Sequence, residues 1–89
     1  MIDLELVRWT DVRMLEIMDG CELYTMPEIA AHLGHTRSST SVVMDRCVRL
    51  GLVRWRPATG CLRIYELTRR GDALLAAARD MRRALQVEP

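Results

Sequence analysis

Residues 25–51, TMPEIAAHLGHTRSSTSVVMDRCVRLG, decide the fold of this chain. The segment opens with Thr25-Met26-Pro27-Glu28, a capping box in which proline occupies the first helical turn, where its missing N–H is not needed. We expect this helix to be short, from Met26 to about Leu33, because Gly34 interrupts its apolar pattern.

A second helix is expected immediately afterwards. Thr36 is a typical N-cap residue, apolar residues then recur at helical spacing to about Leu50, and Gly51 is a typical stop. Only Gly34-His35-Thr36 separate the two helices. Two helices joined by a short turn that contains glycine form a helix-turn-helix, here over about residues 26–50.

Beyond residue 51 the pattern becomes that of a β-hairpin. Residues 52–56 and 61–67 are rich in β-branched and aromatic side chains and alternate in polarity. The sequence Pro57-Ala58-Thr59-Gly60 between them is typical of a hairpin turn. We expect this hairpin to form a wing over about residues 52–67.

Helices are expected on both flanks. Thr10 is a candidate N-cap for a helix that ends near Met18, and Thr68 for a last helix over about residues 69–87. The expected fold is mainly α with a small β-hairpin, in the order helix, helix, helix, hairpin, helix. This order describes a single winged helix-turn-helix domain over residues 1–89.

Composition favours one globular domain. The chain has 89 residues, of which 49% are hydrophobic and 28% charged, enough for one modest core. It contains no apolar run long enough for a membrane span, and acidic residues at positions 3 and 5 argue against a signal peptide. We therefore expect a cytoplasmic protein with no membrane partner.

The arginines are concentrated in the middle of the chain. Residues 37–70 carry eight arginines against two acidic residues, a net charge of +6, whereas residues 1–36 carry two arginines against seven acidic residues, a net charge of −5. A block this basic suits a polyanionic partner such as nucleic acid.

Three segments, Ile29–Gly34, Leu50–Val53 and Tyr65–Gly71, together resemble the winged-helix transcription regulators of the MarR, ArsR and PadR type. The resemblance extends over about residues 10–78. It implies that the helix 37–50 enters the major groove of double-stranded DNA, while the hairpin reaches the minor groove or the flanking phosphates. MarR proteins carry longer helices at both termini, which build their dimer and enclose a ligand pocket. Because the flanks here are short, we expect no large effector pocket, and the sequence indicates no obvious small-molecule effector.

The side chains expected to contact DNA are basic or carry small hydroxyls, with one apolar exception. They are Thr36, Arg37, Ser38, Ser39, Ser41, Val42 and Arg46 on the recognition helix, and Arg54, Arg56, Thr59 and Arg63 in the wing. Arg37 is expected to pair with a guanine and Val42 to meet a thymine methyl group. Asp45 is expected to pair with Arg49 one turn later. The alternative is that the serine-rich face is simply solvated.

Other residues of this region are assigned to the core. Thr40, Val43, Met44, Cys47 and Leu50 share the opposite side of the recognition helix, and Tyr65 and Leu67 share one strand face. Trp55 either stacks on nucleic acid or, as we favour, caps the core beneath the hairpin.

The cysteine and histidine side chains raise two further possibilities, a redox-sensing thiol and a metal site. The three cysteines, Cys21, Cys47 and Cys61, lack CxxC spacing and are expected to be reduced. Cys61, among the wing arginines, is a candidate redox-sensing thiol, although small reduced cysteines more often serve in packing. His32 and His35 alone do not complete a metal shell, so we expect neither metal nor cofactor.

The last helix carries an apolar stripe at spacings of 4, 3 and 4, formed by Leu74, Ala78, Met81 and Leu85. Part of this stripe must cover the domain's own core, but its distal half extends beyond what a winged helix needs. We expect a homodimer, with residues 1–9 as a further candidate segment, and hence a palindromic DNA site.

No catalytic constellation is found in the sequence, so we do not expect an enzyme. The function we expect is that of a sequence-specific DNA-binding transcriptional regulator, a dimeric repressor. The alternative is a winged-helix adaptor that binds other proteins in a replication, transcription or phage assembly, since the acidic N-terminal third could dock on a basic partner.

Overall fold

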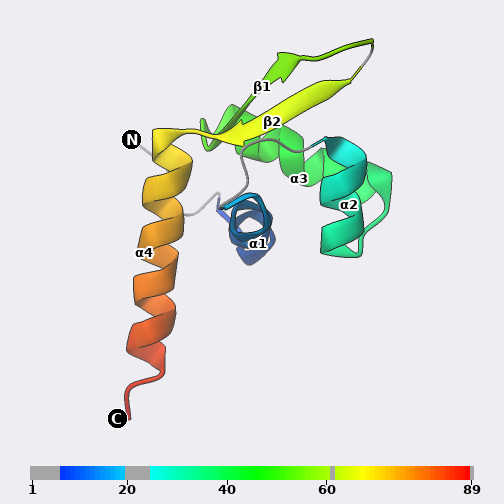
Figure 1. Ribbon diagram of the computed structural model, residues 1–89. Helices are drawn as coiled ribbons and strands as arrows, with labels where there is room; N and C mark the ends of the chain where they lie inside the picture. The colour runs from blue at the N-terminus through cyan, green and yellow to red at the C-terminus, as the bar shows by residue number, and fades with distance from the viewer. Residues whose placement is uncertain (1–6, 20–24, 61, 89) are drawn as a thin grey trace.

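The computed structural model describes residues 7–19, 25–60 and 62–88 of the chain. It contains four helices and a two-stranded antiparallel sheet within these residues. The elements are α1 (Trp9–Met18), α2 (Met26–Leu33), α3 (Arg37–Arg49), β1 (Val53–Pro57), β2 (Arg63–Leu67) and α4 (Arg69–Leu85). Figure 1 shows the hairpin across the top of the molecule, α2 and α3 on one side and α4 on the other. The predicted order of elements is confirmed.

Three of the four predicted helix starts are confirmed. The Thr25 N–H donates to Glu28 Oε1 at 3.3 Å, as a capping box requires. The hydroxyl oxygens of Thr36 and Thr68 accept the backbone N–H groups of Ser39 and Gly71, each at 3.1 Å.

The start predicted for α1 is wrong. This helix begins at Trp9, and Arg8 rather than Thr10 is its N-cap residue. The Arg8 N–H donates to Asp11 Oδ2 at 2.9 Å, so the acidic side chain at the third helical position satisfies the backbone N–H of the cap residue.

Two other predicted boundaries shift. The last helix ends at Leu85, two residues before the expected end. Leu52 lies before β1 and is not its first residue, because its backbone is hydrogen-bonded elsewhere. Its N–H donates to Cys47 O, and its carbonyl accepts the Thr68 N–H. This backbone contact joins the end of α3 to the start of α4.

The strands pair with Val53 opposite Leu67, Trp55 opposite Tyr65 and Pro57 opposite Arg63. Directly opposite residues share a face of an antiparallel sheet. Val53 and Tyr65 on that face are buried. The face that carries Arg54 and Arg56 therefore points away from the core.

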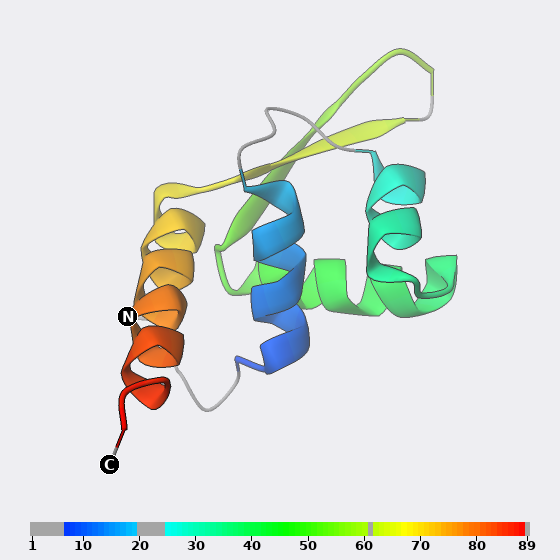
Figure 2. The same ribbon diagram turned by 60° about the horizontal axis from the view of Figure 1, so that its bottom comes forward.

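The core lies where α1, α2 and α3 meet under the hairpin (Figure 2). Met14, Leu15, Ile29, Met44 and Leu52 are completely shielded from solvent. As predicted for the recognition helix, Thr40, Val43, Met44 and Cys47 are also buried, while Leu50 packs against the core and is half-buried.

Gly71 fixes how closely α4 approaches the rest of the domain. A Cβ at this position would lie 2.1 Å from the Leu52 carbonyl oxygen, a distance that no side chain tolerates. After this contact α4 packs against α1 and the core through Leu74, Leu75 and Ala78, and only its distal half is exposed. The molecule has extents of 52 × 28 × 23 Å. In the described part of the chain, no helix is long and apolar enough to cross a membrane.

Candidate nucleic-acid interface

The outer face of α3 is polar and exposed at its start. Arg37, Ser38 and Ser39 are exposed and Ser41 is half-buried. Thr36, which precedes the helix, uses its hydroxyl oxygen to cap it. Val42 is 61% exposed although it lies in the middle of a helix. An exposed branched apolar side chain between hydroxyls is a surface on which a thymine methyl group could pack.

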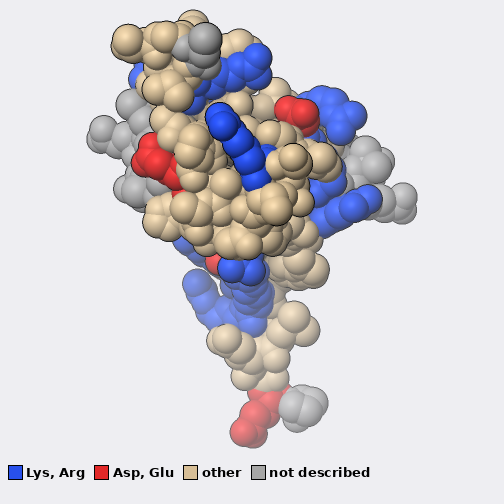
Figure 3. All heavy atoms as spheres, turned by 90° about the vertical axis from the view of Figure 1, so that its right-hand side faces the viewer, with Lys and Arg blue, Asp and Glu red and all other residues tan. Residues whose placement is uncertain are grey.

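Arginine side chains lie around the face of the molecule that carries α2 and α3 (Figure 3). In this view they stand at the hairpin above, in the middle of the face and along its right-hand edge, and only isolated acidic groups interrupt them. Of the basic block seen in the sequence, Arg37, Arg49, Arg54, Arg56 and Arg63 are exposed on α3 and the hairpin.

The wing arginines are not equivalent. Arg54 Nε donates to Glu66 Oε1 at 2.7 Å across the hairpin, so the carboxylate offsets its charge. Arg56 is exposed and makes no ion pair with any residue that the structure describes, and Thr59 is exposed at the hairpin tip. Arg56 is therefore better placed than Arg54 to meet a phosphate.

Arg63 lies over an aromatic ring instead of beside a carboxylate. Its guanidinium carbon is 4.1 Å from the centroid of the Trp55 ring. Trp55 is 41% exposed and does not belong to the core, so the interpretation that it caps the core is wrong. The hairpin register explains the stack, because Trp55, opposite Tyr65, and Arg63, opposite Pro57, are diagonal neighbours on one sheet face.

Arg46 does not face DNA, contrary to the sequence prediction. Its Nε and Nη2 donate to the Asp11 carboxylate at 2.7–3.0 Å, and only 17% of its side chain is exposed. This hydrogen bonding raises the pKa of Arg46. The residue joins α3 to α1 and is not available to a ligand.

The expected pair between Asp45 and Arg49 is also absent from the ion pairs of the described residues. Both side chains are exposed at the C-terminal end of α3. Arg49 therefore adds a cation to the exposed surface of α3.

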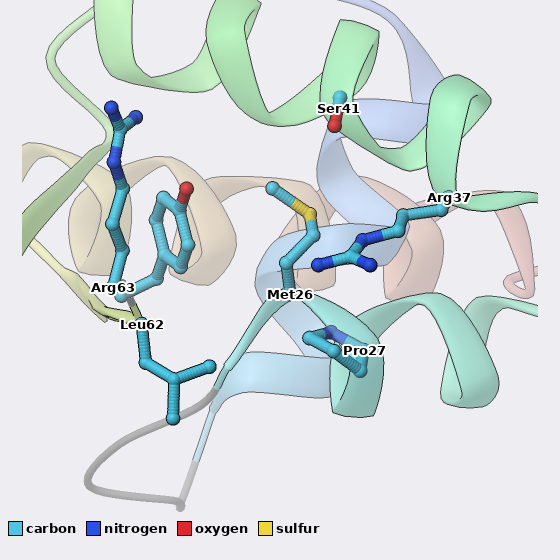
Figure 4. Close-up of a pocket in the computed structure, with 7 residues that line it drawn as sticks. Met26, Pro27, Arg37, Ser41, Leu62 and Arg63 are labelled. Atoms are coloured by element: carbon cyan, nitrogen blue, oxygen red, sulfur yellow. The ribbon is translucent and has the colours of Figure 1, made fainter. Parts of the chain in front are cut away.

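A cleft of about 190 Å³ opens between the start of α2, the start of α3 and the hairpin. We call it the wing cleft. The described residues that line it are Met26, Pro27, Arg37, Ser41, Leu62, Arg63 and Tyr65. Figure 4 shows the Arg37 guanidinium and the Ser41 hydroxyl directed into the cleft, with Arg63 on the opposite wall. The site thus brings together three of the residues predicted to contact DNA.

The cysteines offer no site within the described residues. Cys47 is fully buried, and burial raises the pKa of its thiol from 9.0 to about 12, which keeps it protonated. The candidate redox residue Cys61 lies outside the described residues. No three His, Cys, Asp or Glu side chains of the described ranges come together to hold a metal ion.

The stripe predicted on the last helix divides into two halves. Leu74 and Ala78 are buried at 9% and 5% exposure, whereas Met81 and Leu85 are 56% and 79% exposed. Trp9 of α1 is also exposed, and its ring stacks beneath Arg82 of α4. These three exposed apolar residues, Trp9, Met81 and Leu85, are called the α4 patch below.

No family model and no curated protein matches the chain. Solved structures do match its fold. A MarR family transcription regulator is 27% identical with a TM-score of 0.82 over 91% of this chain. The Mycobacterium tuberculosis regulator MosR, solved in complex with DNA, is 28% identical with a TM-score of 0.80 over 90%. The regulator BldR from Sulfolobus solfataricus is 25% identical with a TM-score of 0.78 over 89%.

The chain spans 56%, 59% and 58% of the length of these three proteins. The match therefore concerns the shared domain and not the whole of each relative. The resemblance to the MarR type is supported, whereas these structures do not bear specifically on the ArsR or PadR type. The chain has the winged-helix fold of solved MarR-family transcription regulators.

Proposed function

We propose that this protein is a transcriptional regulator that binds double-stranded DNA in a sequence-specific manner and acts as a repressor. The observation that carries the proposal is the combination of a winged-helix fold with an exposed polar face on α3 and cationic residues beside it in the hairpin. MosR, with the same fold, is a DNA-binding protein in its solved complex. A regulator of this kind acts on the chromosome, so we place the protein in the cytoplasm.

In this mechanism α3 enters the major groove, where Ser38 and Val42 meet base edges. Arg37, Arg56 and Arg63 then meet backbone phosphates on either side of the helix. A repressor bound in this way blocks access of polymerase to a promoter. The role is binding, with no catalytic step.

We further propose that the protein works as a homodimer. The α4 patch leaves three large apolar side chains exposed, Trp9 at the start of α1 and Met81 and Leu85 in the distal half of α4. Trp9 and Met81 line a groove of about 300 Å³ between α1 and α4, together with Val7, Val12 and Ala77. A second copy of the patch would cover this surface and set two recognition helices about 34 Å apart, one duplex turn.

Fluorescence anisotropy with labelled duplexes tests the proposed DNA binding. One duplex comes from the region upstream of the gene and the other has a random sequence of equal length. We expect tighter binding to the upstream duplex and a steep negative slope of log K against log salt concentration. Equal affinity for both duplexes would contradict sequence specificity. The absence of binding at low salt would contradict a DNA role and favour the protein-binding adaptor.

A further inference from the structure

Arg63 is held by an aromatic ring and not by an acid. Its guanidinium lies 4.1 Å from the Trp55 ring centroid, and among the described residues it makes no ion pair. A guanidinium that stacks on an aromatic face keeps its N–H donors free in its own plane. Arg54 on the other sheet face differs, because Glu66 already accepts from it.

Arg63 and a second arginine line opposite walls of the wing cleft. Arg37 comes from the first turn of α3 and points into the same space, together with the Ser41 hydroxyl (Figure 4). None of the described residues that line the cleft is acidic. An anion in the wing cleft would therefore meet arginines on two walls and no carboxylate of the described lining.

We propose that the wing cleft binds one phosphate group of the DNA backbone and that Trp55 is the positioning residue that preorganises Arg63 for it. This inference rests on the proposed function. It assigns Arg37 to a phosphate instead of the guanine expected from the sequence.

Preorganisation is the reason to single out Trp55. A free arginine side chain loses rotamer entropy when it binds, and a side chain already stacked loses less. The planar guanidinium then presents paired N–H groups that match two phosphate oxygens. Arg56, which has no such support, is the natural comparison.

A double-mutant cycle on the full chain tests the proposal, with the upstream and random duplexes as probes. Arg63→Ala should weaken binding to both duplexes alike and lower the salt slope by about 1, as loss of a phosphate contact does. Trp55→Leu should weaken binding about two- to fivefold in the wild-type background, the size of an exposed cation–π contact. In the Arg63→Ala background, Trp55→Leu should have no further effect.

Two controls separate positioning from a general structural role. Trp55→Phe keeps an aromatic face and should restore binding to within about twofold of the wild-type chain. In an Arg56→Ala background, Trp55→Leu should have its full effect, because Arg56 does not use the ring. Circular dichroism shows whether each variant remains folded, and the Phe variant keeps the test decisive should the Leu variant unfold.

The outcomes are distinguishable. If the wild-type chain binds neither duplex, the proposed function fails and this inference fails with it. If the wild-type chain binds but the effects of Trp55→Leu and Arg63→Ala add, Trp55 does not act through Arg63 and the inference alone is overturned. If Arg63→Ala leaves the affinity unchanged, Arg63 does not bind a phosphate in the wing cleft, and the inference is likewise overturned.

Discussion

The Asp11 carboxylate binds Arg46 across the core, with Asp11 Oδ1 2.7 Å from Arg46 Nη2. Asp11 is completely buried, and its other oxygen also accepts the Arg8 N–H at the start of α1. One side chain therefore caps α1 and fixes the position of α3 against it. The orientation of the proposed recognition helix depends on this pair.

Removal of one partner from this pair should destabilise the fold. Asp11→Ala leaves the Arg46 charge largely buried without its partner, and we expect a loss of about 3 kcal/mol in the free energy of unfolding, measured by urea denaturation. Asp45→Ala is the control, since Asp45 is exposed on α3 next to Arg46 and makes no ion pair with a described residue. The control should change stability by less than about 0.5 kcal/mol. Equal losses in the two variants would contradict the role assigned to Asp11.

Gly71 should not tolerate even alanine. The added Cβ would meet the Leu52 carbonyl oxygen at 2.1 Å, so α4 must move away from the turn after α3. We expect Gly71→Ala to lower the free energy of unfolding by about 2 kcal/mol or more, although alanine has the higher helix propensity. Arg69→Ala, at an exposed position of the same helical turn, should be nearly neutral. A stabilised Gly71→Ala variant would show that the close approach does not exist.

The Cys47 thiol should be inert at neutral pH. Burial raises its pKa from 9.0 to about 12, so the folded chain keeps this proton in a range where the unfolded chain loses it. The contribution of Cys47 to stability is therefore complete below pH 9 and declines as the pH rises toward 12. Iodoacetamide labelling at pH 8, with the modified peptide identified by mass spectrometry, should leave Cys47 unmodified in the native chain and modify it in urea. Comparable labelling in both states would contradict its burial.

The sequence predicted those features that depend on local chemistry. The caps at Thr25, Thr36 and Thr68 and the stop at Gly51 depend on side chains within a few residues, which is why the helix-turn-helix and its boundaries were predicted well. The hairpin followed from alternation and a turn sequence.

The partner of each arginine could not be predicted from the sequence, because it depends on residues that are distant along the chain. Arg46 lies 35 residues from Asp11, and helical periodicity placed it only at the margin of the exposed face. The stack of Arg63 on Trp55 depends on the register of the two strands, which the length of the turn alone does not fix. Arg54 and Glu66 are opposite each other for the same reason.

The α4 patch should control the oligomeric state. Leu85→Asp places a charge on a side chain that is 79% exposed in one copy but covered in the proposed dimer. Analytical ultracentrifugation should give twice the chain mass of 10.2 kDa for the wild-type chain and the single mass for this variant. Gln86→Asp, at the neighbouring exposed position outside the apolar stripe, is the control and should remain dimeric. A monomeric wild-type chain would contradict the proposed dimer.

Val42 should affect which sequence is bound, and Arg56 should affect how strongly any sequence is bound. Val42→Ala removes two methyl groups from a side chain that is 61% exposed on the proposed groove-facing side of α3. We expect the preference for the upstream duplex over the random one to fall by about 1 kcal/mol, with the salt slope unchanged, because no phosphate contact is lost. Arg56→Ala should weaken binding to both duplexes to the same extent and lower the salt slope by about 1. Anisotropy titrations at four salt concentrations measure both quantities. If Val42→Ala lowers the salt slope while leaving the preference intact, α3 does not present this side chain to the bases, and the proposed docking of the helix in the major groove is wrong.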